Sequence, residues 1–334
     1  MDMEQKKKEE PVLIATREAY GDALVEFGAQ YPNLVVLDAD LAEATKTVKF
    51  KKAYPDRFFD CGIAEGNMVT VAAGLASTGM IPFASSFAMF TAGRAFEQIR
   101  NAIGYPHLNV KIGATHAGIT VGEDGATHQC LEDFATMRCI PGMTIFSPAD
   151  AVETRAAVEA ALKIEGPVYL RLGRMPVPLI FKPEDYKMEV GKGRVLVEGN
   201  DLTIFATGMM VSAALEACKI LREERDIDAA VVNILTIKPL DTTLITSMAQ
   251  RTGAIVTAEE HNIIGGLGSA ICEVVAENHP VPVERVGVRD TFGRSGKVPQ
   301  LLELYGLTPK AIVNAAVKAV SKKERPVQLT PRRR

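Results

Sequence analysis

The segment THAGITVGEDGATHQ, residues 115–129, gathers side chains that can bind anions or move protons. It holds His116 and His128, two of the chain's five histidines, with Glu123 and Asp124 side by side between them. Imidazoles donate hydrogen bonds to phosphate and exchange protons near neutral pH, and carboxylates accept hydrogen bonds from hydroxyls. The interspersed glycines let the backbone approach a ligand closely. The segment is therefore a candidate site for a polar or anionic substrate.

Two other interpretations of this segment stay open from its residues alone. It could be an ordinary solvated turn, because glycine and short polar residues dominate turns. Its two imidazoles and two carboxylates could instead bind zinc, although their spacing matches no compact motif such as HExxH.

Two further segments carry candidate residues. DCGIAEGNMVTVAAG, residues 60–74, places Glu65 at the start of an apolar helix, where an acid complements the helix dipole. Its flanks are nearly devoid of charge, so we expect Glu65 to be buried beside a hydrogen-bonding partner. SSFAMF, residues 85–90, places Phe87 and Phe90 three positions apart, a spacing more typical of core packing than of a cofactor contact.

The elements that must position these residues alternate along the chain. Short β-rich runs lie at 34–38, 80–86, 108–114, 143–147 and 167–172, with helical patterns between them. Buried runs separated by helices favour a largely parallel sheet covered on both faces. Ligands bind beyond the carboxyl ends of such strands, so all three segments, which lie close to predicted strand ends, are candidate site loops.

A break at MPVPLIFKPEDY, residues 175–186, separates two such patterns, because it carries three prolines and has no clear period. The α/β pattern restarts at 202–208, 228–234 and 253–260, and GGLGSA further on favours a tight strand-to-helix turn. The predicted fold class is thus α/β with two doubly wound domains. The predicted domains cover residues 11–185 and 190–325, and the charged ends, 1–10 and 326–334, are predicted to be solvated, disordered tails.

The composition argues against several function classes. The net charge of −3 implies no broad basic surface for nucleic acid, and no apolar run is long enough to span a bilayer. The five cysteines form no CxxC pair, which favours a reducing compartment, and the charged N-terminus does not have the form of a signal peptide. We therefore expect a cytoplasmic protein.

Taken together, these segments resemble the C-terminal half of transketolase. THxxxxxGEDGxTHQ is the most specific stretch, and IATREA, LDADL, GIAEGNM, SSFAMF and PVYLRLGR occur in the family's order before EEHNIIGGLGSA. The resemblance runs from about residue 11 to 322. It implies a pyrimidine-binding module of thiamine diphosphate enzymes, followed by a transketolase C-terminal domain.

The resemblance also implies a missing module. In the family, the pyrophosphate-binding module carries GDG and a metal-binding segment, and this chain contains no GDG. The expected enzyme is therefore split. An N-terminal transketolase subunit would supply the GDG module and most of the contacts to Mg²⁺ or Ca²⁺, and this chain would supply no metal ligand. The family builds its site between subunits, so we expect a homodimer of this chain and a heterotetramer with the partner.

The resemblance assigns roles at the cofactor. Glu65 matches the glutamate that hydrogen-bonds N1′ of the aminopyrimidine, a role that an apolar, pKa-raising setting would favour. Phe87 and Phe90 match aromatics that pack against the pyrimidine ring, which reverses the core interpretation drawn from their spacing. Asp40, in the DADL loop, is placed near the cofactor.

It also assigns roles at the substrate. His116 matches a residue near the sugar phosphate, and Asp124 matches one that accepts a hydrogen bond from the C2 hydroxyl. His128 matches a residue that contacts reacting oxygens and moves protons. Arg17 and Arg174 match phosphate-binding arginines, whose guanidinium groups suit bidentate contacts. Catalytic roles thus fall on Glu65, His116 and His128.

Two positions depart from the family pattern. Ala44, followed by Thr45, stands where a phosphate-binding serine is frequent, and Gly93 replaces an aromatic near the pyrimidine ring. The predicted reaction is still transfer of a two-carbon ketol unit from a ketose phosphate to an aldose phosphate. Both departures bear on where the substrate phosphate is bound.

The sequence features also bear on three alternative functions. A related synthase condenses pyruvate with glyceraldehyde 3-phosphate to form 1-deoxy-D-xylulose 5-phosphate, but its loop usually has no first histidine, so His116 disfavours it. The beta subunit of a 2-oxo acid dehydrogenase shares less of the loop. A non-catalytic scaffold subunit would be expected to have an eroded site, whereas the predicted site residues are all present.

Overall fold

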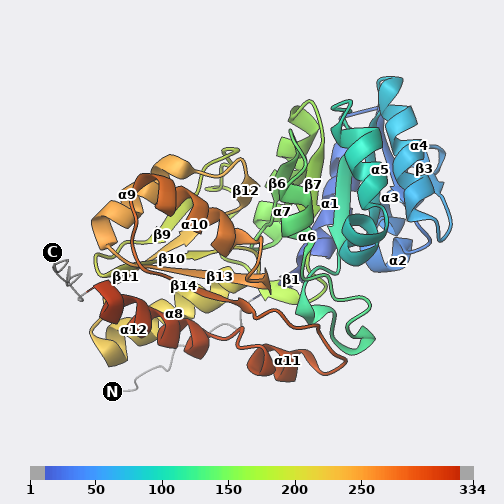
Figure 1. The fold of residues 1–334 in the computed structure, drawn as a ribbon. Helices are drawn as coiled ribbons and strands as arrows, with labels where there is room; N and C mark the ends of the chain where they lie inside the picture. The colour runs from blue at the N-terminus through green and yellow to red at the C-terminus, as the bar shows by residue number, and fades with distance from the viewer. Residues whose placement is uncertain (1–11, 324–334) are drawn as a thin grey trace, which may run out of the picture.

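The computed structural model describes residues 12–323, so the predicted tails at 1–10 and 326–334 lie outside the described residues. Two α/β units lie side by side, each built on its own sheet (Figure 1). This arrangement confirms the predicted fold class.

The first sheet has seven strands in the order β12-β6-β7-β5-β4-β2-β3. All neighbours pair in parallel except β12, which runs antiparallel to β6. The strands are β2 (Leu34–Asp38), β3 (Phe58–Asp60), β4 (Ile81–Phe87), β5 (Lys111–Thr115), β6 (Thr144–Phe146), β7 (Val168–Arg171) and β12 (Thr236–Lys238). β2 matches its predicted range in full, β6 and β7 lie within theirs, and β4 and β5 overlap theirs.

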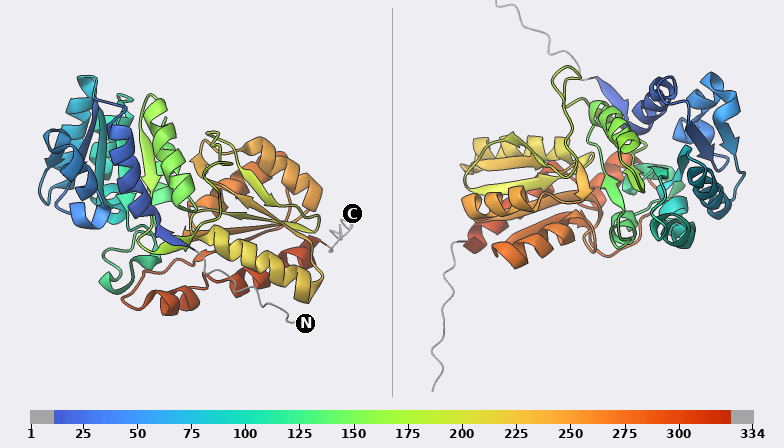
Figure 2. Two further views of the ribbon diagram at one scale, coloured as in Figure 1. Left: turned by 180° about the vertical axis from the view of Figure 1, so that it is seen from behind. Right: turned by 90° about the horizontal axis from the view of Figure 1, so that it is seen from above.

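Helices cover both faces of this sheet. They are α1 (Thr16–Gly28), α2 (Ala42–Thr45), α3 (Val48–Ala53), η1 (Pro55–Arg57), α4 (Glu65–Ser77), η2 (Met89–Arg94), α5 (Phe96–Gln98), η3 (Ile99–Gly104), η4 (Ile119–Asp124), α6 (Asp133–Arg138) and α7 (Ala151–Lys163). α1 and α7 share one core on one face, whereas α4, α5 and α6 contribute to another on the opposite face (Figure 2). α1 buries Tyr20, Ala23, Leu24 and Phe27, the spacing of one helical stripe.

The second sheet has five strands in the order β14-β13-β10-β11-β9. Its strands are β9 (Arg194–Val197), β10 (Leu202–Ala206), β11 (Ala229–Asn233), β13 (Ile255–Asn262) and β14 (Val283–Val288). Its helices are α8 (Met210–Arg225), α9 (Thr242–Thr252), α10 (Leu267–Asn278), α11 (Val298–Leu304) and α12 (Pro309–Lys323). Residues 263–266 turn from β13 into α10, as GGLGSA predicted.

The segment between the two units is pinned at several points. β1 (Leu13–Ala15) pairs antiparallel with β8 (Pro176–Pro178), inside the proline-rich stretch predicted to be a linker. Asp150 caps α7 by accepting the Glu153 N–H, and its other oxygen accepts the N–H groups of Ile180 and Phe181. β12 leaves the second unit to pair with the first sheet. The two units are therefore joined by backbone pairing as well as by packing.

Within residues 12–323, no helix is long and apolar enough to cross a membrane.

Candidate active site

Three loops meet at the carboxyl edge of the first sheet. Residues 116–129 follow β5, the Phe87–Phe90 segment follows β4, and Glu65 lies in the segment that follows β3. Since β5 and β4 are neighbours and β2 separates β4 from β3, these strand ends lie close together. The structure thus brings together the three segments that the sequence selected.

Aromatic stacking joins the loop histidines to the phenylalanines. The His116 ring stacks on Phe87 with centroids 3.8 Å apart, and Phe87 stacks on Phe90 at 5.6 Å. His128 meets Phe90 edge-on, with centroids 5.2 Å apart. Thr127 Oγ1 lies 2.9 Å from His128 Nδ1. The four rings form one stacked cluster, to which both histidines of the glycine-rich segment belong.

His116 is held as a neutral imidazole with a defined tautomer. A guanidinium can only donate, so Arg17 Nη1, 3.2 Å from Nε2, makes that nitrogen the acceptor. Nδ1 then carries the proton and donates to Thr115 Oγ1 at 2.9 Å. Burial, followed by the charges of Arg17 and Arg174, lowers the pKa of His116 to about 3. Its φ of 56° lies in the left-handed region, which is uncommon outside glycine.

Two arginines lie beside the histidine. Arg17 also donates to the Ala44 carbonyl at 2.9 Å, and Arg174 donates to the Val121 carbonyl. Arg174 Nη1 lies 3.9 Å from Asp124 Oδ2. Burial lowers the pKa of Arg17, and the positive charge of nearby Arg174 adds to that effect. Two neighbouring cations in a partly buried setting favour an anionic ligand between them.

Glu65 begins α4 and is buried, with 2% of its surface exposed. The sequence predicts a hydrogen-bonding partner for Glu65, and in the structure this partner is Arg94. Its Nη1 lies 3.0 and 2.9 Å from the two carboxylate oxygens. The same guanidinium stacks over the Phe90 ring, 4.8 Å from its centroid. The environment of Glu65 is therefore not as purely apolar as expected, because the Arg94 guanidinium pairs with its carboxylate. Arg94 is not among the residues predicted from the sequence, because it lies among helical residues.

The DADL loop places Asp40 less centrally than the other candidates. Asp40 is exposed with φ 61°, and its N–H donates to Asp60 Oδ1 at 3.1 Å. Asp38 organises the loop instead. It is fully buried and accepts hydrogen bonds from the Leu41 N–H and from the hydroxyls of Thr45 and Thr47. Burial raises the pKa of Asp38 to about 6. An acid ending an apolar strand was the sequence signal for it.

The two departures from the family pattern have structural consequences. The buried Thr45 hydroxyl donates to Asp38 at 2.7 Å, so it is turned inward and does not replace a serine at Ala44. Gly93 lies in η2, a π-helical turn of the kind frequent at functional sites. A Cβ on Gly93 would lie 2.3 Å from Met89 Cε, so a larger residue there requires Met89 to move.

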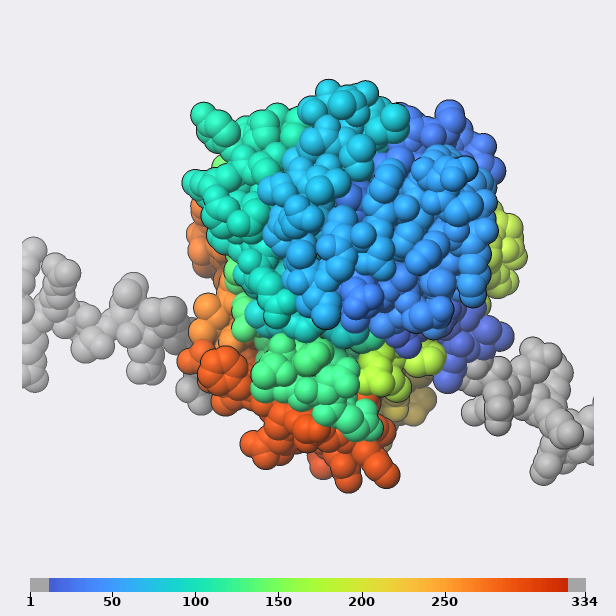
Figure 3. All heavy atoms as spheres, turned by 90° about the vertical axis from the view of Figure 1, so that its right-hand side faces the viewer, coloured from blue at the N-terminus to red at the C-terminus, as the bar shows by residue number. Residues whose placement is uncertain are grey.

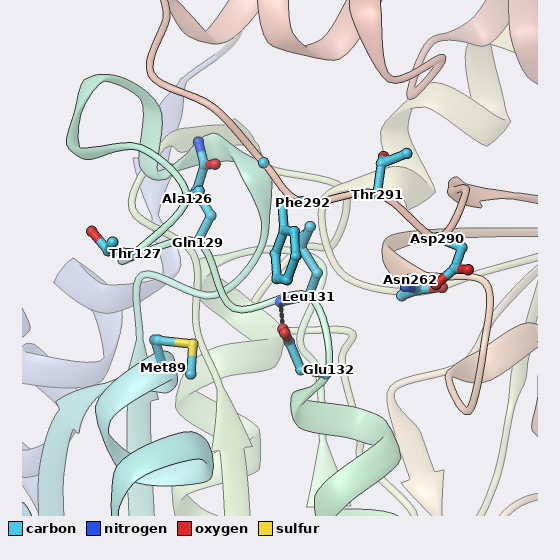
Figure 4. Close-up of a pocket in the computed structure, with 11 residues that line it drawn as sticks. Met89, Ala126, Thr127, Gln129, Leu131, Glu132, Asn262, Asp290, Thr291 and Phe292 are labelled. Carbon is cyan, nitrogen blue, oxygen red and sulfur yellow. Dashed lines mark hydrogen bonds between the residues drawn. The ribbon is translucent and has the colours of Figure 1, made fainter.

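A cavity of about 610 Å³ lies next to the ring cluster, between the two units (Figure 4). Met89, Thr127 and Gln129 line it from one side, and Asn262 and Phe292 from the other. Its lining includes the carboxylates of Glu132 and Asp290 and, among the described residues, no Lys or Arg. A phosphate is therefore better placed at Arg17 and Arg174 than in this cavity.

The residues present fit the pyrimidine half of thiamine diphosphate. Phe87 and Phe90 supply near-parallel apolar rings and Glu65 supplies a buried carboxylate, although in this structure His116 stacks on Phe87 and the Arg94 guanidinium covers Phe90. The diphosphate half is different. Across residues 12–323, no three His, Cys, Asp or Glu side chains are grouped to hold a metal ion.

Comparison with known proteins agrees with this arrangement. Residues 13–178 match the family model for the transketolase pyrimidine-binding domain, and residues 191–312 match that for the transketolase C-terminal domain. A Methanocaldococcus jannaschii protein provisionally named a transketolase C-terminal section is 50% identical, covering 92% of this chain and 96% of that protein. The chain belongs to the transketolase family.

Other members of the family differ in substrate and in length. The 6-deoxy-6-sulfo-D-fructose transketolase subunit SqwH of a Clostridium species is 45% identical over 92% of this chain and 95% of that protein. Rat transketolase is 40% identical over 92% of this chain but only 49% of its own length. A solved structure described as a split-gene transketolase, an inactive beta4 tetramer, is 57% identical and superposes with a TM-score of 0.86, covering 93% of this chain and 99% of that one.

Proposed function

We propose that this chain is the catalytic half of a split transketolase, which transfers a two-carbon ketol unit from a ketose phosphate to an aldose phosphate. The observation that carries the proposal is the neutral His116, stacked on Phe87 and hydrogen-bonded to Arg17. His116 thus lies between the aromatic rings proposed to contact the cofactor and the arginines proposed to bind the phosphate. A scaffold subunit would have no need to keep such a constellation.

The proposed cofactor is thiamine diphosphate, which when bound supplies the nucleophilic carbon that carries the ketol unit. Phe87 and Phe90 would pack against its pyrimidine ring, and Glu65 would hydrogen-bond N1′ after Arg94 gives up at least part of its contact. Asp40 would lie at the edge of this site. Mg²⁺ or Ca²⁺ would be held mainly by the partner subunit.

The substrate roles follow from the positions of the charged groups. Arg17 and Arg174 would bind the sugar phosphate, and the neutral His116, whose ring nitrogens are paired with Arg17 and Thr115, would hold Arg17 in place without adding charge. Asp124, 43% exposed and near Arg174, would accept the hydrogen bond of the C2 hydroxyl. His128, partly exposed and edge-on to Phe90, would move a proton at the reacting oxygens.

The proposed partner is an N-terminal transketolase subunit with the GDG module, in a cytoplasmic heterotetramer built on a dimer of this chain. One face near Glu65 supports an interface. Ile63, just before α4, is 78% exposed and Val71, on α4, is 38% exposed, so apolar side chains are open to a partner on this face. The proposed domains remain 11–185 and 190–325.

A donor test decides between the proposed reaction and the synthase alternative. The chain is purified with its N-terminal partner, thiamine diphosphate and Mg²⁺. One sample receives xylulose 5-phosphate and ribose 5-phosphate, and another receives pyruvate and glyceraldehyde 3-phosphate. Sedoheptulose 7-phosphate in the first sample alone is expected. Carbon dioxide in the second alone would refute ketol transfer and the role of His116.

Because relatives are named for other sugars, the same complex is also tested with 6-deoxy-6-sulfofructose and apulose 4-phosphate as donors. The role of Asp124 is tested with ribose 5-phosphate against 2-deoxyribose 5-phosphate, which differ only at the C2 hydroxyl. Asp124→Ala is expected to lower the preference for the hydroxylated acceptor more than it lowers cofactor affinity. Equal rates with both acceptors in the unmutated enzyme would contradict this role.

A further inference from the structure

The second α/β unit, here called the second domain, contacts the substrate loop, residues 116–129, through Glu260. Glu260, near the end of β13, is 4% exposed, and its Oε1 accepts the N–H of Thr120 at 2.7 Å. The two residues are 140 positions apart. Thr120 lies between His116 and Asp124, so this bond reaches the middle of the loop that carries both.

The loop backbone is shaped around this carboxylate. Gly118 has φ +85°, and a Cβ built on it would lie 2.3 Å from both the carboxyl carbon and Oε1 of Glu260. A side chain at Gly118 would therefore force the loop and the Glu260 carboxylate apart. The carboxylate packs against the loop at Gly118, two residues from His116, and holds it by a hydrogen bond at Thr120.

Other contacts fix the rest of the loop to the same domain. Gln129 Nε2 donates to the carbonyls of Ile119 and Gly122, and to that of Arg294 in the second domain. Ser295 Oγ donates to the Glu123 carbonyl. Figure 3 shows this green loop lying directly against the orange segment that contains Ser295.

The apolar part of the loop also belongs to the second domain. Ile119 is fully buried in a core that includes Leu202 and Ile204 of β10 and Leu301 of α11. Burial of this apolar side chain is favourable, so the loop centre is held by packing as well as by hydrogen bonds. The substrate loop is thus shared between the two domains.

We propose that Glu260 is a positioning residue of the active site, which fixes residues 118–120 so that His116 and Asp124 are presented at the substrate. This inference rests on the proposed function for the identity of the substrate. Glu260 does not reach the reacting atoms. It acts through the loop backbone. Through Glu260, the second domain would influence which substrate is selected.

A purely structural role makes a different prediction. Glu260 also lies near the buried Arg171, which donates to the backbone carbonyl of Glu260 at 2.8 Å and to Asp133 at 2.8 Å. On a purely structural interpretation, the Glu260 carboxylate would serve only to balance the charge of Arg171. Glu259 provides the matched control. It is on the same strand and fully buried, but its oxygens accept the N–H groups of Leu267 and Gly268, at the start of α10.

The test compares Glu260→Gln with Glu259→Gln in the complex with the partner subunit, thiamine diphosphate and Mg²⁺. We measure kcat and KM for ribose 5-phosphate and for 2-deoxyribose 5-phosphate. Glu260→Gln is expected to lower the preference for the C2-hydroxylated acceptor on the order of tenfold, because small displacements of a binding group are costly. Glu259→Gln is expected to leave this preference within about twofold.

A second measurement does not depend on activity. Hydrogen–deuterium exchange on the full chain reports the Thr120 amide, and replacing a charged acceptor by a neutral one should speed its exchange on the order of tenfold. Glu259→Gln should leave peptides covering 117–122 unchanged. Gly118→Ala, which pushes the loop away from the same carboxylate, should reproduce both effects and serves if Glu260→Gln does not fold.

The outcomes separate this inference from the proposed function. Unchanged exchange at Thr120 in Glu260→Gln, or equal changes in both glutamine variants, would overturn the positioning role. If the unmutated complex transfers no ketol unit, the proposed function fails, while the exchange result still decides whether Glu260 fixes the loop. Altered exchange with an unaltered acceptor preference would show a structural contact without an effect on selection, which also overturns the proposal.

Discussion

Replacing His116 by glutamine should make the chain less sensitive to acid. In the folded chain the pKa of His116 is about 3, because the ring is buried beside Arg17 and Arg174. In the unfolded chain it returns to an ordinary value near 6.5. Below pH 6.5 the unfolded chain takes up a proton that the folded chain does not, so stability falls as the pH falls, until the folded pKa is reached.

The size of the effect follows from these two values. Each pH unit between them lowers the free energy of unfolding by about 1.4 kcal/mol, so His116 accounts for a loss of about 2 kcal/mol between pH 7.5 and 5.0. Glutamine has no such proton to take up, and its side-chain oxygen can still accept from Arg17. Buried carboxyls with raised pKa values, such as Asp38, act in the opposite direction but are common to both proteins and cancel in the comparison.

The assay is urea unfolding of the full chain at pH 7.5 and 5.0, followed by circular dichroism at one fixed chain concentration. The unmutated chain should lose about 2 kcal/mol more than His116→Gln between the two pH values. His261, which lies outside the substrate loop, is a second buried histidine for comparison. Its pKa is lowered to about 4, mainly by burial. His261→Gln should reduce the acid sensitivity by a similar amount.

Parallel losses of stability in the unmutated chain and in His116→Gln would refute this reasoning. They would mean that His116 takes up its proton in the folded chain, so that Arg17 is not its hydrogen-bonding partner. The proposed substrate site would then carry one more positive charge than its geometry indicates.

Three further substitutions test other parts of the site and fold. Arg94→Met leaves Glu65 buried without its partner and should lower the free energy of unfolding by about 1–3 kcal/mol. The control, Arg222→Met, breaks an exposed ion pair and should lower it by less than about 1 kcal/mol. Thermal unfolding measures both changes. Asp150→Ala removes the α7 cap and the linker anchor and should cost about 2–4 kcal/mol in urea unfolding, and an unchanged midpoint would contradict that role. Ala44→Ser, which restores the family's hydroxyl, should lower KM for a sugar phosphate about fivefold in the assembled complex, and a raised KM would place the phosphate elsewhere.

Much of the fold could be predicted because its signals are local. β2 matches a continuous apolar run, and α1 follows from one stripe of apolar residues, since each pattern reflects the period of its own element. β3 and β14 were not predicted. β3 has only three residues, and β14 contains Glu284 and Arg285, so neither forms a long apolar run.

The candidate site divides in the same way. Residue types in 115–129 made the segment a candidate, the resemblance to transketolase singled out His116, Asp124 and His128, and the position of the loop after a strand predicted where they would lie. Arg94 and Asp38 were not selected, because one lies among helical residues and the other ends an apolar strand, as many residues with no role at a site do. The deciding observation for each was a partner, Glu65 for the first and two hydroxyls for the second.

By itself, the sequence determined the α/β class, the two repeating patterns and the loop that carries the candidate chemistry, because periodicity and strand-end loops are properties of neighbouring residues. Only the tertiary structure decided that His116 is neutral, that Arg94 pairs with Glu65, and that Glu260 holds the substrate loop. These are contacts between residues 29 to 140 positions apart, where protonation and loop position depend on burial and on which charge lies opposite.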